Sequence, residues 1–104
     1  MIQCKFTNSA KRDLEDIRDY TLKHWGRQQT IKYLDEIHNK AIALSLNPNI
    51  GTLRNDIYPT LLSFPTKKHI LYYLKQEYGI IIVRVLHKHM CYKLHNFPNL
   101  NNLK

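Results

Sequence analysis

Long hydrophobic runs are absent from this chain of 104 residues. The longest, residues 80–83, ends at Arg84 and is far too short to cross a membrane. The first six residues also lack the hydrophobic region of a signal peptide. We therefore expect a cytosolic protein that has no association with a membrane.

Cysteine is scarce, and metal-binding motifs are missing. The two cysteines, Cys4 and Cys91, form no CxxC pair, and in the cytosol we expect both to be ordinary thiols. The six histidines show no HxxxH or HExxH spacing. His87 and His89 would point to one side of a strand, but no third ligand is evident. The sequence thus predicts neither a metal site nor a cofactor.

Acidic residues are few in the second half of the chain. Lys and Arg number 16 against eight Asp and Glu, which gives a net charge of +8. Residues 47–104 hold eight of the basic residues and two of the acidic ones, a net of +6. Such a field attracts DNA, RNA or an acidic protein. A solvated basic surface that serves only solubility is the alternative, and charge alone does not separate the two.

The first half of the chain has helical periodicity. Residues 2–6 alternate between apolar and polar, as a strand does, and a side-chain oxygen from residues 7–9 can cap a helix that follows. The first helix is expected to end at Gly26 and a second one before Pro48. The link around Gly26 is so short that the two helices must form an antiparallel hairpin.

The second half reads as a sheet. After an irregular connection over 47–60, we expect strands over 61–64, 69–74 and 80–87, with hairpin-length links between them. The predicted fold is α+β, in the order β-α-α-β-β-β, with a helical hairpin packed on one face of an antiparallel sheet. We expect a single domain over 1–95 and a loosely ordered, Asn-rich tail over 96–104.

Both faces of the last two predicted strands are largely apolar. Residues 80–87 carry apolar side chains in both alternating rows, although one helical hairpin covers only one face. The second face therefore needs a cover, and we expect a partner protein or a second copy of the chain. The alternative is that residues 88–104 fold back over it.

Over residues 5–92 the chain resembles the ParE branch of the RelE/ParE toxin superfamily. Each short stretch is weak by itself, but their order and spacing are specific. The stretches are Ser9–Thr21, His24–Gly26, Tyr33–Leu34, Asn47–Gly51 with Arg54, Asp56 and Ile57, Phe64–Pro65, His69–Tyr73, and Ile82–His87 with Met90. The chain departs from the family pattern at Cys91 and Tyr92.

This resemblance implies a RelE/ParE-like fold and the toxin of a type II toxin–antitoxin, or plasmid stabilisation, system. A ParE toxin inhibits DNA gyrase by stabilising its complex with cleaved DNA, has no cofactor and is not an enzyme. A cognate antitoxin neutralises it, and operator DNA is contacted only through that antitoxin. A homodimer or a toxin–antitoxin hetero-oligomer is also expected. We expect the antitoxin to contact Trp25, Tyr33, Leu71, Tyr73, Ile80, Ile82 and Leu86.

The basic second half supplies the expected contacts with the target. These residues are Arg54, Lys67, Lys68, Arg84, His87, Lys88, His89 and Lys93. The alternative function is that of the RelE branch, a metal-free endonuclease that cuts mRNA on the ribosome. Its chemistry needs a proton acceptor, a proton donor and a cation at the phosphate. Arg54, Arg84, His87, His89 and Tyr92 are the candidates for these roles. Arg84 also has a purely structural interpretation, an ion pair with Asp56 or with the C-terminal carboxylate.

Overall fold

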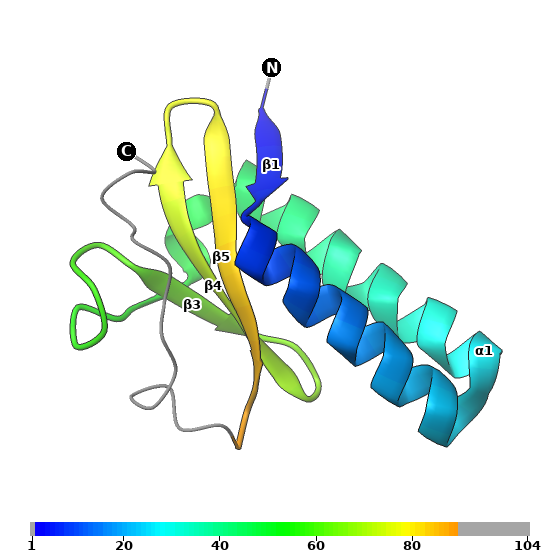
Figure 1. Cartoon of the computed structure of the whole chain (residues 1–104). Helices are drawn as coiled ribbons and strands as arrows, with labels where there is room; N and C mark the ends of the chain where they lie inside the picture. The colour runs from blue at the N-terminus through cyan, green and yellow to red at the C-terminus, as the bar shows by residue number, and fades with distance from the viewer. Residues whose placement is uncertain (1, 90–104) are drawn as a thin grey trace.

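The computed structural model describes residues 2–89, in which a short strand leads into helices and then into a sheet (Figure 1). No helix in this part of the chain is long and apolar enough to cross a membrane. The elements, in chain order, are β1 (Gln3–Phe6), α1 (Asn8–Leu46), the 3-10 turn η1 (Pro48–Ile50), β2 (Thr52–Leu53), β3 (Leu62–Pro65), β4 (His69–Gln76) and β5 (Gly79–His87).

The predicted helical hairpin is present as the two arms of α1. Gly26 interrupts the helix with φ 83° and ψ 176°, a conformation that costs glycine little and most other residues much more. The arms lie side by side and run in opposite directions (Figure 1). Burial along the two arms is not uniform, since Tyr33 is buried, whereas Trp25, Ile31 and His38 are exposed.

The sheet has five strands in the order β1-β5-β4-β3-β2. Three of its four pairings are antiparallel, but β1 pairs with β5 in parallel, from Gln3 opposite Gly79 to Phe6 opposite Ile82. The prediction of a purely antiparallel sheet is therefore wrong. In the sequence, the helical hairpin lies between β1 and the other strands. In the folded chain, β1 lies beside β5, the last strand in the sequence. The short edge strand β2 was also not predicted, since its two residues lie in the segment interpreted as irregular.

Gly79 permits the close approach of β1 to the start of β5. Its φ is +143°, and a Cβ at this position would collide with the carbonyl oxygen of Gln3. The backbone N–H of Gln3 also donates to the carbonyl of Tyr78, in the turn between β4 and β5. The parallel pairing thus depends on the absence of a side chain at residue 79.

Two hydrophobic clusters lie on opposite faces of the sheet. The cluster beneath α1 joins Tyr33, Ile37, Ala41 and Leu44 of the helix to Leu71, Tyr73, Ile80, Ile82 and Val85 of the strands. The other contains Leu61, Tyr72, Leu74, Ile81, Val83 and Leu86, and Ile57, Tyr58 and Ile70 pack against it.

The second face is not open in the single chain. All six core members of its cluster are 8% exposed or less. Ile57 and Tyr58, from the connection between β2 and β3, supply part of this packing. The expectation of an uncovered apolar face is therefore wrong for the isolated chain. The alternative cover over 88–104 falls almost wholly outside the described residues.

Candidate functional site

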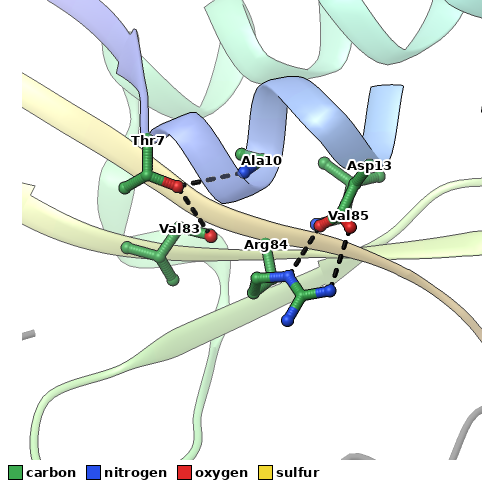
Figure 2. Close-up of polar contacts among 6 residues, drawn as sticks. All are labelled: Thr7, Ala10, Asp13, Val83, Arg84 and Val85. Carbon is green, nitrogen blue, oxygen red and sulfur yellow. Dashed lines mark hydrogen bonds and ion pairs between the residues drawn. The ribbon is translucent and has the colours of Figure 1, made fainter. Parts of the chain in front are cut away.

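A junction between α1 and the edge of β5 fixes the position of the helix (Figure 2). The pairing of β1 with β5 stops at Phe6, and from there side chains of the helix satisfy the strand edge. The Thr7 hydroxyl donates to the Val83 carbonyl at 2.9 Å and accepts from the Ala10 N–H at 3.1 Å. Thr7 is therefore both the cap of α1 and an anchor to the sheet. We call Thr7, Asp13, Arg84 and Val85 the β5 junction.

Asp13 is the centre of the β5 junction. Its carboxylate accepts from Arg84 Nε at 2.7 Å, from Arg84 Nη2 at 2.9 Å and from the Val85 N–H at 2.9 Å. The side chains of Arg84 and Asp13 are 15% and 12% exposed, so this pair is largely removed from water. The hydrogen bond to Asp13 raises the pKa of Arg84, with burial opposing and the Asp13 charge assisting. The pair holds helix and strand together.

The other candidate arginine is also paired with a carboxylate. Arg54 donates from Nε and Nη2 to the two oxygens of Asp56, at 3.0 Å and 2.9 Å. Both expected phosphate-binding arginines thus present two donors to a carboxylate within the chain. Each carboxylate holds the Nε edge of its guanidinium and neutralises its charge, so neither arginine presents that edge to a phosphate in this arrangement.

A groove of about 1050 Å³ lies beyond the β5 junction, between α1 and the ends of β4 and β5. We call it the basic groove. Its helix side presents Asp13, Asp16, Ile17, Tyr20, Thr21, Trp25, Gln29 and Tyr33, and its strand side presents Lys67, Lys68, His69, Val85, Leu86, His87, Lys88 and His89. The antiparallel register places His69 opposite His87, which brings the turn after β3 beside the end of β5.

A hydrogen-bond chain at the base of the groove ties the helix to this turn. The Lys68 N–H donates to the Tyr33 hydroxyl at 3.2 Å, and that hydroxyl lies 2.6 Å from His69 Nδ1. Thr66 Oγ1 accepts from the His69 N–H and donates to the His69 carbonyl. The tautomer of the neutral His69 ring sets which of the two atoms is the donor in this hydrogen bond. The chain fixes the backbone at Lys68 and His69.

Burial lowers the pKa of His69 from 6.5 to about 4, with the positive charges of His87 and Lys68 assisting and Asp13 opposing. His69 is therefore neutral at pH 7, and its ring can take part in this hydrogen bond as either tautomer. The rings of His69 and His87 meet edge to face at 5.2 Å, and those of His87 and His89 lie 5.2 Å apart. These contacts form a row of imidazoles from the base of the groove to its rim.

The rim of the basic groove combines cations with aromatic rings. Lys67, Lys68 and Lys88 are all exposed. The ammonium of Lys68 lies 5.0 Å from the ring centroid of Trp25, which is itself 60% exposed. Two acidic side chains, Asp13 and Asp16, line the groove, and Asp13 is already paired with Arg84. Exposed positive charge and an exposed aromatic ring thus lie side by side on this rim.

Comparisons with known proteins identify the family. Residues 4–92 match the family model described as "ParE toxin of type II toxin-antitoxin system, parDE". The chain belongs to the ParE toxin family. It is 35% identical to "Toxin ParE1" of Mycobacterium tuberculosis, over 79% of this chain and 85% of that protein. It is 25% identical to "Toxin ParE1" of Caulobacter vibrioides, over 88% of this chain and 94% of that one.

A solved structure supports the fold of this ParE-family toxin. The chain aligns with one from the "Chromosomal ParDE TA system from P. aeruginosa" with a TM-score of 0.72, over 84% of this chain and 96% of that chain. At 21% identity this likeness shows the fold alone. It confirms the α+β, RelE/ParE-like architecture that the sequence predicted.

The ParE-family fold brings together part of the predicted target surface. Lys67, Lys68, His87, Lys88 and His89 all line the basic groove. Arg84 belongs to the β5 junction, and Arg54 is paired in the connection after β2. Tyr92 and Lys93 lie outside the described residues, as does Cys91.

The residues expected to contact an antitoxin divide into two groups. Trp25, Tyr33 and Leu86 line the basic groove. Leu71, Tyr73, Ile80 and Ile82 have exposed fractions of 0% and belong to the cluster beneath α1, where no partner reaches them. Their assignment to an accessible face is wrong, because they lie on the face of the sheet that the helical hairpin already covers.

His69 is a groove residue that sequence reasoning missed as a site. It begins a strand, and only its pairing opposite His87 brings it to the groove. A strand pairing counted back from the Glu77–Tyr78 turn would have placed His69 opposite Leu86, because the register shift between Tyr72 and Tyr73 moves the pairing by one residue. Within residues 2–89 no group of three His, Cys, Asp or Glu side chains is arranged to hold a metal ion.

Proposed function

We propose that this toxin acts as a binding protein on DNA gyrase. It stabilises the gyrase complex with cleaved DNA, and a cognate antitoxin in the cytoplasm neutralises it. The observation that carries the proposal is the convergence of Lys67, Lys68, His87, Lys88 and His89 around one groove. A concentrated positive surface speeds the encounter with a protein–DNA complex and orients it.

The pairing of the arginines favours binding over RNA cleavage. A metal-free nuclease needs a cation held ready for the scissile phosphate. Arg84 and Arg54 are each engaged by a carboxylate through two donors. His69 has a pKa lowered to about 4 and is hydrogen-bonded to the Tyr33 hydroxyl, which suits a structural role.

The basic groove is also the proposed seat of the antitoxin. Trp25 is exposed on its helix side, and Tyr33 and Leu86 lie among its walls. A partner segment that filled this groove would cover the exposed indole and mask the lysines at the same time. Neutralisation then follows from occupation of the surface that contacts the target.

The experiment is a paired activity test on the purified toxin. Incubation with DNA gyrase, ATP and plasmid should accumulate cleaved DNA after protein denaturation and protease treatment. A second arm supplies translating ribosomes and mRNA. Codon-dependent mRNA cuts without cleaved DNA would contradict the proposal and assign the toxin to the RelE-like endonucleases. Activity in neither arm would also contradict it.

A further inference from the structure

The lysines of the basic groove are exposed and largely unneutralised. Lys67 lies 3.5 Å from Glu36, but its side chain is 68% exposed, so water weakens that pair. Of the two carboxylates that line the groove, Asp13 is already matched by Arg84. Asp16 is the other, and it lies on the helix side. The strand side, with Lys67, Lys68 and Lys88, is therefore the side on which an anion is attracted.

The helix side of the same groove presents exposed aromatic rings. Trp25 and Tyr20 are 60% and 61% exposed, although both are large side chains that gain from burial. Tyr20 stacks on His24 with ring centroids 4.0 Å apart, which holds its ring in one orientation. The Lys68 ammonium lies over the indole of Trp25 and links the two sides. The groove thus has cations along one wall and aromatic faces along the other.

This combination distinguishes among anionic partners. An acidic protein segment meets the lysines with its carboxylates but needs separate apolar side chains to cover the aromatic faces. Duplex DNA uses the lysines too, but its bases are stacked inside the helix. A single strand offers both groups at once, since its phosphates meet cations while its unstacked bases lie on aromatic rings. Asp16 repels phosphates from the helix side, which directs the backbone to the strand side and the bases toward Trp25.

We propose that the basic groove is a binding site for single-stranded DNA, with phosphates along Lys67, Lys68 and Lys88 and a base stacked on Trp25. The site deepens the proposed function and rests on it for the origin of the strand. Stacking tolerates every base, so the site recognises the strand without reading its sequence.

Trp25 is the only tryptophan of the chain and serves as the reporter. Titration of the full-length toxin with an oligo(dT) strand should quench its fluorescence, because a stacked base changes the surroundings of the indole. Contacts with three phosphates give a salt slope of about −2, so the affinity should fall roughly 15-fold between 50 and 200 mM salt. An unchanged emission with no salt-dependent binding would overturn the proposal.

Variants separate stacking from charge. Trp25→Ala should weaken binding of a labelled oligo(dT) about tenfold or more, as measured by fluorescence anisotropy. Lys88→Gln should weaken it and reduce the salt slope by about 0.7. Lys75→Gln is the matched control, since Lys75 lies near the other end of β4, roughly 20 Å from Lys68. Circular dichroism checks that each variant is folded, which we expect because all three side chains are exposed.

Competing strands and polymers decide the class of ligand. Duplex DNA and polyglutamate should bind more weakly than oligo(dT), and Trp25→Ala should not affect their binding. Equal affinity for polyglutamate, with no effect of Trp25→Ala, would overturn the proposal and indicate an acidic protein partner. Binding of oligo(rU) tenfold tighter than oligo(dT) would overturn it in favour of RNA.

The gyrase assay distinguishes failure of this site from failure of the proposed function. Oligo(dT) binding is measured without gyrase. Suppose that neither wild-type toxin nor Trp25→Ala binds oligo(dT), but both cause the same accumulation of cleaved DNA. The single-stranded DNA site would then be refuted, and the gyrase proposal would stand. If the toxin binds oligo(dT) but has no effect on gyrase, the gyrase proposal would be refuted and the single-stranded DNA site would stand.

Discussion

Arg84 and Lys88 are four residues apart on and just beyond β5, and the fold uses their charges in opposite ways. Arg84 meets the Asp13 carboxylate of α1 at 2.7 Å and is 15% exposed. Lys88 lies past the end of the strand, exposed on the rim of the basic groove. The first charge is matched and largely removed from water, so loss of its carboxylate partner would destabilise the fold. The second remains in water, where it can attract a partner.

The same contrast holds for the neighbours of each residue. At the β5 junction every named polar group faces a partner within the chain, as Thr7 does with Val83 and Ala10. In the basic groove a fixed base of Tyr33 and His69 supports an exposed rim of lysines. The net charge of a segment therefore does not tell where it acts, because a single carboxylate from a distant helix decides which cations stay available.

The largest expected effect is loss of toxicity when the rim charge is reversed. Lys88→Glu combined with His89→Glu places negative charge where the target is proposed to dock, so growth arrest on expression should disappear. The measurement is colony formation after induction, and circular dichroism checks that the variant is folded. Lys23→Glu with Lys75→Glu, outside the groove, is the control and should remain toxic. If the rim variant remained as toxic as the wild-type chain, the rim charges would not be the target contact.

Disruption of the β5 junction should lower the stability of the folded chain. Asp13→Ala leaves the Arg84 guanidinium without its carboxylate in a largely buried setting, so the free energy of unfolding should fall by about 3 kcal/mol. Urea denaturation measures it. Asp19→Ala is the matched control on the same helix, since Asp19 pairs with Arg18 while 66% exposed, and it should change stability by less than about 0.5 kcal/mol. Equal losses in both variants would refute a buried role for Asp13.

The base of the groove should make stability depend on pH. The pKa of His69 in the folded chain, about 4, lies below its unfolded value of 6.5, so the unfolded chain binds a proton first as the pH falls. Its contribution is complete above about pH 6.5 and is lost toward pH 4. We expect a loss of roughly 2 kcal/mol, allowing for solvent screening of a partly exposed ring.

Urea denaturation at pH 7 and pH 4.5 tests the role of His69. His69→Gln removes the titrating group, so the pH-dependent loss of stability should be smaller in this variant than in the wild-type chain. His38→Gln changes an exposed histidine of α1 and should leave the wild-type pH dependence in place. The same loss in the wild-type and His69→Gln chains would show that His69 is not responsible.

The smallest effect concerns the cap of α1. Thr7→Ala removes the acceptor for the Ala10 N–H and the donor to the Val83 carbonyl, and should lower the free energy of unfolding by about 1 kcal/mol. Thr7→Ser keeps the hydroxyl and should recover most of the loss. If both variants were equally unstable, the methyl group and not the hydroxyl would anchor the helix.

Much of the architecture follows from local patterns. The strands over 69–76 and 79–87 have continuous apolar character, and the helical hairpin turns at Gly26 where glycine was expected to end a helix. The parallel pairing of β1 with β5 could not be predicted from the sequence, since Gln3 and Gly79 meet only after the whole chain is folded. Pairing between distant segments leaves little trace in either segment alone.

The faces of the sheet were also undecidable from alternation. Both rows of β5 are apolar, so the period of two does not tell which row faces the helices. A register shift between Tyr72 and Tyr73 changes the pairing again, from Arg84 opposite Tyr72 to Ile82 opposite Tyr73. Leu71 and Ile80 were for this reason assigned to a partner, although they lie in the core beneath α1.

The amino-acid sequence alone specifies an excess of positive charge in the second half of the chain and a cluster of basic residues near the end of the last strand. It also specifies the α+β fold, because apolar periodicity and glycine positions are local properties. Which of these charges can contact a partner depends on the tertiary contacts. The tertiary structure pairs Arg84 with Asp13 and places Lys67, Lys68 and Lys88 beside Trp25. Those relations depend on distances between segments far apart in the chain, and folding alone sets those distances.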